Sequence, residues 1–190
     1  MVIPRMRKTT KIGVAALALA VIGSGAASAA EAGKAIPQPK VDGLPVAAAQ
    51  KRVDLSLPGF TRPTEITNPL FPVSQQASVL FTGRVDDKPF RTEVTLLPFT
   101  RIVVWEGIEV ETLVSQYVGY LDGRVQEVAY GLYAQADDGS VWHFGEDVSD
   151  FRDGVITTRE GTWLAGKDGA PGMIMPGKPK VGDAFRAENL

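Results

Sequence analysis

The sequence predicts an all-β protein whose single sheet is an antiparallel meander of hairpins, curled or partly closed into a barrel-like shape. Two observations carry this prediction. Apolar and polar residues alternate with a period of two through much of the chain after residue 77, as in strands that bury one face. Four Asp-Gly pairs supply the residue types that tight turns need. They are spaced by 16, 15 and 15 residues and lie at 122–123, 138–139, 153–154 and 168–169.

Residues 1–30 have the three parts of a secretory signal peptide. Basic residues between Arg5 and Lys11 precede an apolar run at 12–22, and the small residues 27–29 form a cleavage site of the Ala-x-Ala type. The apolar run has 11 residues, whereas a helix that crosses a bilayer needs about 20. We therefore expect the signal to be cleaved and the mature protein to be periplasmic or extracellular, with no membrane span.

Composition limits the domain count and the partners of the exported chain. Its 190 residues contain no cysteine, so the mature part must be held together by burial, without disulfides. About 160 residues follow the signal, a length that suits one domain with a sizeable core. All 22 acidic residues but only 16 of the 20 basic residues lie after residue 30, and the resulting charge of −6 argues against a nucleic-acid partner.

Two segments of irregular sequence precede the strands. Residues 31–57 are rich in alanine, proline, lysine and glutamine and contain no aromatic residue, which is typical of a flexible arm or linker. Residues 58–75 contain four prolines, which remove backbone donors and favour an extended chain. We expect 58–190 to form the β-rich domain, with Phe60, Leu70 and Phe71 as apolar anchors of its first segment.

The strands are expected to follow one another as hairpins, with Asp86–Lys88 and Glu106–Gly107 as further turns. Proline cannot donate to a strand ladder, so Pro98 should separate the second strand from the third. Acidic residues after 145 are interpreted as solvated turns. The expected strands lie at 77–85, 91–96, 101–105, 108–118, 124–136, 140–145, 155–159 and 160–165.

The last residues are expected to be a loop and the start of another strand. The loop at 167–179 carries Met173 and Met175 among glycines and prolines, and we interpret it as a lid on the sheet rather than a partner-binding tip. Residues 181–186 resemble the beginning of a strand that stops at Leu190. An unfinished strand would leave unpaired backbone groups at the sheet edge, so we expect a truncated sequence whose sheet continues further.

Two blocks of the sequence resemble a family of uncharacterised exported bacterial β-rich proteins. The first block contains Tyr133-Ala134-Gln135, Gly139, Val141-Trp142 and Phe144-Gly145-Glu146. The second contains Gly161, Trp163, Ala165-Gly166, Asp168-Gly169-Ala170, Pro171-Gly172 and Met175-Pro176. His143 departs from the family pattern, in which tyrosine is usual. The resemblance covers about residues 67–186; it implies an exported β-rich fold and implies no activity.

His143 is the only histidine, and nucleophilic or zinc chemistry would depend on it. One histidine cannot form a histidine-rich zinc site, and no Gly-x-Ser-x-Gly nucleophile motif occurs. In its expected strand His143 faces away from Trp142, which places it at the surface or at the edge of the core. The sequence therefore predicts a protein that is not an enzyme and that needs no metal or cofactor.

Acidic residues supply two chemical alternatives. Glu146, Asp147, Asp150 and Asp153 are close in sequence, but their spacing differs from that of the Asp-x-Asp-x-Asp-Gly calcium loop. A glycosidase would need two carboxylates that face each other across about 5–9.5 Å. The pairs that the sequence offers are Glu109 with Glu111 and Glu146 with Glu160. Solvated charges on strands and turns are the stronger interpretation.

A ligand-binding role is the leading functional hypothesis. Curled sheets can hold a small molecule against aromatic side chains, although large aromatics in a disulfide-free domain are also the expected core. The candidate ligand-binding residues are Tyr133, Trp142, His143, Trp163, Met173 and Met175, with Tyr117 as a further aromatic. We expect a non-enzymatic protein that binds a small apolar or envelope-derived ligand. A structural or interaction module of the cell envelope is the second hypothesis, and a hydrolase is the third.

Overall fold

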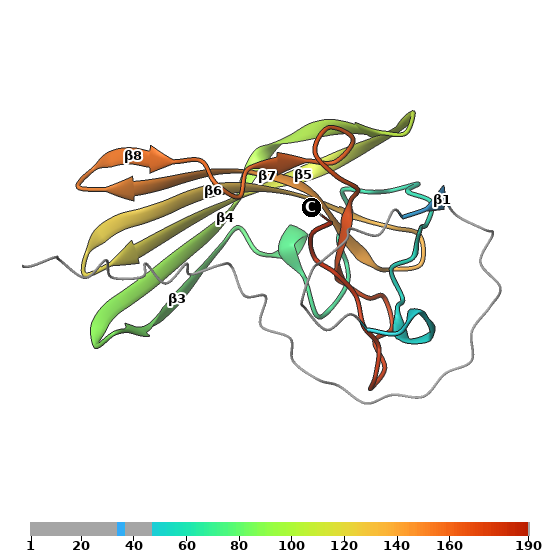
Figure 1. Ribbon diagram of the computed structural model, residues 1–190, viewed down its shortest axis with the longest axis horizontal. Coiled ribbons are helices and arrows are strands. Elements are labelled where there is room, and N and C mark those ends of the chain that lie inside the picture. The colour runs from blue at the N-terminus through green and yellow to red at the C-terminus, as the bar shows by residue number, and fades with distance from the viewer. Residues whose placement is uncertain (1–33, 37–46, 190) are drawn as a thin grey trace, which may run out of the picture.

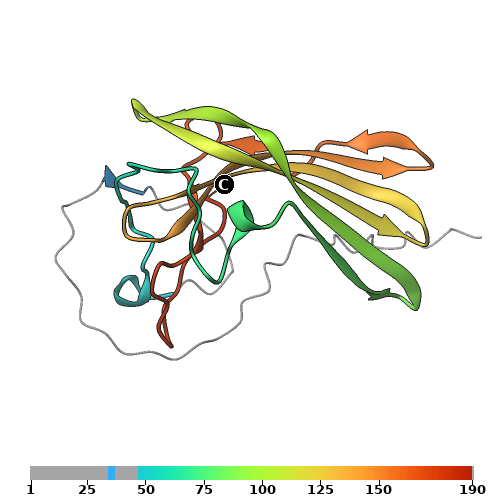
Figure 2. The same cartoon turned by 180° about the vertical axis from the view of Figure 1, so that it is seen from behind.

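The computed structural model describes residues 34–36 and 47–189, so the expected signal peptide lies outside the described residues. Within them the protein is all-β, and the main sheet is an antiparallel meander of hairpins that is curled but not closed into a barrel, which confirms the predicted fold class. Figures 1 and 2 show the long hairpins fanning out on one side, while the segments near both described ends of the chain gather on the other.

Ten strands and two 3-10 turns make up the described structure, which contains no α-helix. Their bounds are β1 (Lys34–Ala35), η1 (Ala49–Lys51), β2 (Ser56–Leu57), η2 (Val73–Gln75), β3 (Ser78–Val85), β4 (Lys88–Trp105), β5 (Ile108–Leu121), β6 (Arg124–Gln135), β7 (Val141–Arg152), β8 (Val155–Thr158), β9 (Trp163–Leu164) and β10 (Gly172–Met175). The main sheet has the order β10-β7-β6-β5-β4-β3, and β8 and β9 also pair with β7. β1 and β2 form a separate two-stranded ladder.

The turns between the long strands use the residues that the sequence predicted for them. Glu106, Asp122 and Asp153 adopt positive φ angles of 47°, 54° and 52°, and each is followed by a glycine. Asp86 and Asp87 turn the chain between β3 and β4 with φ angles of 47° and 62°. Two consecutive residues in this region give a turn whose twist matches that of the paired strands. The prediction of these four turns is confirmed.

Three strand boundaries were predicted wrongly. β4 continues through Pro98. Its register with β5 shifts between Leu96 and Thr100, so Pro98 lies in an irregular stretch where the ladder does not require a backbone N–H donor. β7 includes 146–152, where we expected acidic turns, because this half of the strand pairs with both β6 and β8. The strand expected at 160–165 is reduced to the two residues of β9.

The end of the chain also differs from the prediction. Residues 172–175, which we expected within a lid, form the edge strand β10 and pair with β7. Residues 181–186, which we expected to begin a strand, form none. Ala184 makes only an isolated parallel bridge with Arg52. The segment after β10 therefore runs beside the residues that precede β2.

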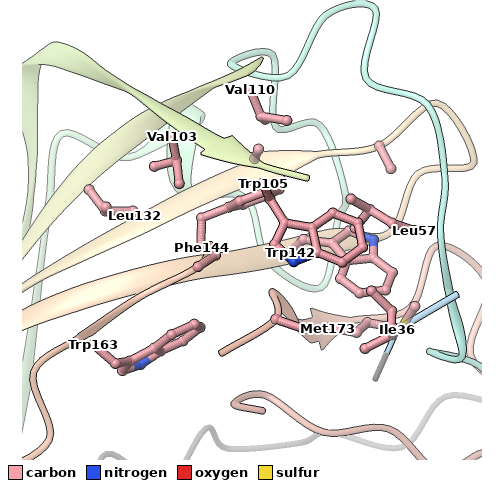
Figure 3. Packing of buried hydrophobic residues seen from close by; sticks show 14 of the residues in the cluster. Ile36, Leu57, Val103, Trp105, Val110, Leu132, Trp142, Phe144, Trp163 and Met173 are labelled. Atoms are coloured by element: carbon pink, nitrogen blue, oxygen red, sulfur yellow. The ribbon is translucent and has the colours of Figure 1, made fainter. Parts of the chain in front are cut away.

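The hydrophobic core lies at one end of the sheet, where the side chains of Trp142, Phe144 and Trp163 are buried (Figure 3). Two side chains from outside the expected β-rich domain belong to the same cluster, Ile36 after β1 and Leu57 in β2. The described part of the segment that we expected to be a flexible arm therefore packs onto the sheet. The boundary expected at residue 58 stays a prediction.

A buried ion pair before β2 also holds the C-terminal segment through a hydrogen bond. The Arg52 guanidinium donates two hydrogen bonds to the Asp54 carboxylate, from Nε to Oδ1 and from Nη2 to Oδ2, both 2.6 Å long. The backbone N–H of Arg186 donates a third, 2.8 Å long, to Oδ2. The side chains of Arg52 and Asp54 are only 4% and 0% exposed, so water reaches neither charge.

Replacing Gly172 with alanine is expected to destabilise the fold by about 1–3 kcal/mol, because β10 lies directly against the C-terminal segment. A Cβ atom at Gly172 would lie 2.1 Å from the carbonyl oxygen of Ala187 and 2.3 Å from its carbonyl carbon. Backbone cannot swing aside as a flexible side chain would. Urea denaturation measures the loss, and Gly83→Ala in β3 is the control, because a Cβ there meets nothing within 4 Å. Equal effects of the two substitutions would contradict this packing.

Candidate functional site

A pocket of about 280 Å³ lies between the main sheet and the proline-rich segment, which we define as residues 58–76. We call the side of the sheet toward this pocket the front face. Strands β3 to β7 and Ile174 of β10 form one wall, and residues 70–76, which include η2, form the other. In Figures 1 and 2, η2 is the short green coil beside the middle of the sheet. Most of the lining side chains are apolar, as is usual in small-molecule sites.

The strand register explains why side chains of several strands meet at the pocket. One cross-strand row, from β3 to β6, consists of Val79, Val94, Tyr117 and Ala129. The next row, from β5 to β7, consists of Ser115, Gly131 and Glu146. Residues in such a row point to the same face and lie about 4.5–5.5 Å apart. The small residues Ser115 and Ala129 therefore leave a hollow that the larger side chains surround, and Gly131 makes room for the ring of Tyr133, which lies against it.

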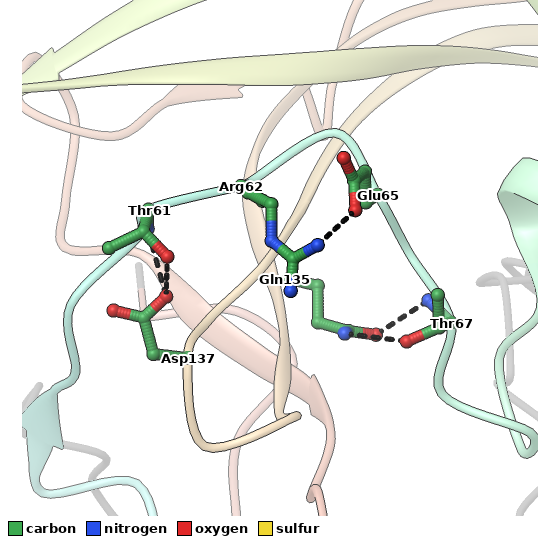
Figure 4. Close-up of polar contacts among 6 residues, drawn as sticks. All are labelled: Thr61, Arg62, Glu65, Thr67, Gln135 and Asp137. Carbon is green, nitrogen blue, oxygen red and sulfur yellow. Dashed lines mark hydrogen bonds and ion pairs between the residues drawn. The ribbon is translucent and has the colours of Figure 1, made fainter.

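Hydrogen bonds from β6 and the turn that follows it hold the proline-rich segment in place (Figure 4). Thr61 donates its backbone N–H and its hydroxyl to Oδ1 of Asp137, at 2.9 and 2.6 Å, and these bonds lower the pKa of the Asp137 carboxyl. Oε1 of Gln135 accepts hydrogen bonds from the backbone N–H groups of Thr67 and Asn68, at 2.9 and 2.8 Å. The second wall of the pocket is thus fastened to the end of β6.

An aromatic column runs from the pocket into the core. Phe71, in the proline-rich segment, contacts Tyr133 of β6 with ring centroids 5.3 Å apart. Tyr133 stacks on His143 at 4.8 Å, and His143 meets Trp163 edge to face at 5.2 Å. His143 is only 3% exposed, so the expectation that it lies at the surface or at the edge of the core is wrong. Its ring lies buried on the front face beside that of Tyr133, its partner on the neighbouring strand, and does not line the pocket.

Burial lowers the pKa of His143 to about 4, so its imidazole is neutral at pH 7. Neither ring nitrogen has a hydrogen-bond partner among the described residues. Backbone groups of Gly145 and Ala187 lie near enough to oppose the fall in pKa, but they do not reach hydrogen-bonding geometry. His143 therefore packs as a neutral ring against the side of Tyr133 that is turned away from the pocket.

A β-bulge in β7 decides which of its side chains face the pocket. Between the pairs Leu132–Gly145 and Tyr133–His143, β7 has one residue more than β6. The bulge displaces the alternation by one position, so Glu146 lies on the same face as His143 although the two are three residues apart. Gly145 adopts a φ of 140°, a backbone conformation that favours glycine at this position.

Glu146 is the one charged residue among the described residues that line the pocket. Burial, reinforced by repulsion from Glu188 and Glu127, raises the pKa of Glu146 to about 7. Partial burial also raises the pKa values of those two carboxyls, and the charge of Asp150 adds to the effect on Glu127. Burial and the Glu127 charge raise the pKa of Tyr117 to about 12, which keeps its hydroxyl neutral. The pocket thus combines apolar walls with one carboxyl that titrates near neutral pH.

The structure separates the six residues that the sequence proposed for ligand binding. Tyr133 lines the pocket, and His143 lies behind it without lining it. Met175, at the end of β10, is half-buried and does not line the pocket. The residues that belong to the hydrophobic core are Trp142, Trp163 and Met173. The further aromatic candidate, Tyr117, does line the pocket.

Glu146 is the charged residue among the pocket-lining residues that sequence reasoning did not propose as ligand contacts. A glycine within an expected strand often marks a bulge, and Gly145 was the available signal. The acidic residues considered for calcium are spread along β7 and its turn, where Asp147 pairs with Arg159 at 3.1 Å and Asp153 pairs with Arg124 at 3.2 Å. Among the residues that the structure describes, no group of three or more His, Cys, Asp or Glu side chains could hold a metal ion.

Comparisons with protein-family models, with curated proteins and with solved structures find no match for this chain. The family resemblance carried by the two sequence blocks therefore stays a prediction. Within 34–36 and 47–189, no helix is long and apolar enough to cross a membrane.

Proposed function

We propose that the protein binds a small, largely apolar molecule in the pocket between the front face of the sheet and the proline-rich segment. The pocket itself carries the proposal: a hollow of about 280 Å³ bordered by Phe71, Phe81 and Tyr133 among aliphatic side chains. A ligand there would exchange water for apolar surface, which favours binding by about 25 cal/mol per Å² buried. With the export that residues 1–30 predict, the ligand would be a compound of the cell envelope or its surroundings.

The same lining supports a binding role over a catalytic one. Only one carboxyl, that of Glu146, borders the described pocket, whereas glycoside hydrolysis uses two. Ser115 supplies a hydroxyl, but the histidine that would have to activate it, His143, is packed behind Tyr133. We therefore propose that the ligand leaves the pocket chemically unchanged.

Val94→Phe is expected to weaken binding of the neutral fluorophore N-phenylnaphthylamine by at least about tenfold, because the added ring would occupy the hollow. Val94 is half-buried in a central strand and lines the pocket, so its side chain can grow into open space. Fluorescence titration measures the affinity.

Thr95→Phe is the matched control, because the neighbouring position of β4 points to the other face of the sheet. This variant should bind the fluorophore as the unmodified protein does. The proposed function would be overturned if the unmodified protein failed to bind the fluorophore. It would also be overturned if Val94→Phe bound it with unchanged affinity while remaining folded by circular dichroism.

A further inference from the structure

The charge within the pocket comes from Glu146 alone. No other charged side chain of the described chain lines this space, and Glu146 makes no described hydrogen bond or ion pair through its carboxylate. The charge of Arg159 is already engaged, because Arg159 pairs with Asp147, which points to the opposite face of β7. The pocket therefore holds an acidic group that has no counter-charge among the residues that the structure describes.

The groups around Glu146 increase this imbalance. The two charged residues that act on its carboxyl are also acidic, Glu127 on β6 and Glu188 in the C-terminal segment. Tyr117 and Tyr133, the other titratable groups that face the same space, are neutral hydroxyls at pH 7 because burial raises both of their pKa values. An anionic ligand would be repelled here, and an uncharged hydrocarbon would leave a carboxylate that has lost water without gaining a partner.

We infer that the ligand of this pocket is an apolar amine whose ammonium group pairs with the Glu146 carboxylate, an inference that rests on the proposed binding function. The ammonium would donate charge-assisted hydrogen bonds to the carboxylate oxygens, which are stronger than bonds between neutral groups. The ring of Tyr117, which also lines the pocket, would add the attraction of aromatic rings for cations. The hydrocarbon part of the ligand would lie along the row that contains Val79 and Val94.

Three probes of equal chain length test this inference: octylamine, octanol and octanoate, each used to displace N-phenylnaphthylamine at pH 8. At that pH octylamine is protonated, and Glu146, with a pKa of about 7, is ionised. Octylamine should bind at least about tenfold more tightly than octanol, the difference that one charge-assisted hydrogen bond produces, and octanoate should bind most weakly.

Two variants with the same change of charge locate the effect. Glu146→Gln should lower the affinity for octylamine to that for octanol, both measured in the same variant. Asp147→Asn removes a charge from the adjacent residue on the opposite face and should leave the preference for octylamine intact.

The possible results separate the two proposals. If octylamine and octanol bind equally, the preference for amines is overturned while the binding pocket stands. If octylamine keeps its advantage in Glu146→Gln, its ammonium lies elsewhere and the assignment to Glu146 is overturned. If the unmodified protein does not bind the reporter, the proposed function falls, and the inference falls with it.

Discussion

Replacing Asp54 with alanine is expected to lower the free energy of unfolding by about 3–5 kcal/mol, because it breaks a buried ion pair from one side. The carboxylate accepts two hydrogen bonds from Arg52 and one from the backbone N–H of Arg186. Without it, a guanidinium that is only 4% exposed would remain in the interior with no opposite charge. Urea denaturation followed by tryptophan fluorescence measures this loss.

Two further variants define what the Asp54 result means. Glu65→Ala removes one member of the exposed pair Arg62–Glu65, which is 3.0 Å long, and should change stability by only about 0–1 kcal/mol. The double variant Arg52→Met with Asp54→Leu should recover most of the loss, because apolar side chains of similar size often replace a buried pair without penalty. A loss in Asp54→Ala no larger than that in Glu65→Ala would show that the guanidinium finds water or another partner.

Acidification from pH 7 to pH 4 is expected to remove about 3 kcal/mol of stability through His143. The imidazole has a pKa of about 4 in the fold and 6.5 as its ordinary value, because burial disfavours its charged form. The unfolded chain therefore takes up the proton first, and stability increases with pH throughout this interval. The contribution of His143 is complete above about pH 6.5 and is lost as the pH falls to 4.

Glu146 contributes a pH dependence of the opposite sign. Its pKa is raised from 4.5 to about 7 in the fold, so the folded state holds a proton that the unfolded state has released. Its stabilising contribution is present below pH 4.5 and is lost as the pH rises through 7. Because Glu146 is only half-buried, we expect this effect to be about 1 kcal/mol. The pH dependence of the free energy of unfolding is therefore the difference between two opposing contributions, those of His143 and Glu146. Substitution of each residue isolates its contribution.

His143→Phe isolates the larger of these two contributions to the pH dependence of stability, that of His143. A phenyl ring keeps the aromatic column but cannot take up a proton, so any packing penalty is the same at each pH. Between pH 7 and pH 4 the variant should lose about 3 kcal/mol less than the unmodified protein. Glu146→Gln serves as the comparison and should retain the acid sensitivity that His143 produces. Identical pH profiles for His143→Phe and the unmodified protein would contradict the assignment.

The hairpin architecture was predictable because its determinants are local. Asp122 and Asp153 reach positive φ beside a glycine, as the Asp-Gly pairs predicted, and alternation of apolar and polar residues marked β3 and β5. The burial of Trp142 and Trp163 was also weighed in advance, since large aromatics in a domain without disulfides usually form the core. Each of these features depends on neighbours within a few positions.

The candidate site was harder to predict because it depends on contacts between distant segments. Alternation alone places Glu146 on the face opposite His143, and only the bulge at Phe144 brings both to the front face. The second wall of the pocket depends on Gln135 and Asp137, which accept hydrogen bonds from a segment about seventy residues earlier. Neither pairing leaves a periodic signal in the sequence. Of the aromatic candidates, only Tyr117 and Tyr133 therefore line the pocket, whereas Trp142 and Trp163 belong to the core.

The attachment of the proline-rich segment has a consequence for the order of folding. The hydrogen bond between Thr61 and Asp137 spans 76 residues, and the one from Asn68 to the carbonyl of Pro176 spans 108. Contacts of such long range form late, because the loops they close must first lose their conformational entropy. We therefore expect the segment that completes the pocket to dock after β6, β7 and β10 are in place. Only the fully folded domain would therefore bind the ligand. A chain in which the proline-rich segment has not docked would have the sheet but no pocket.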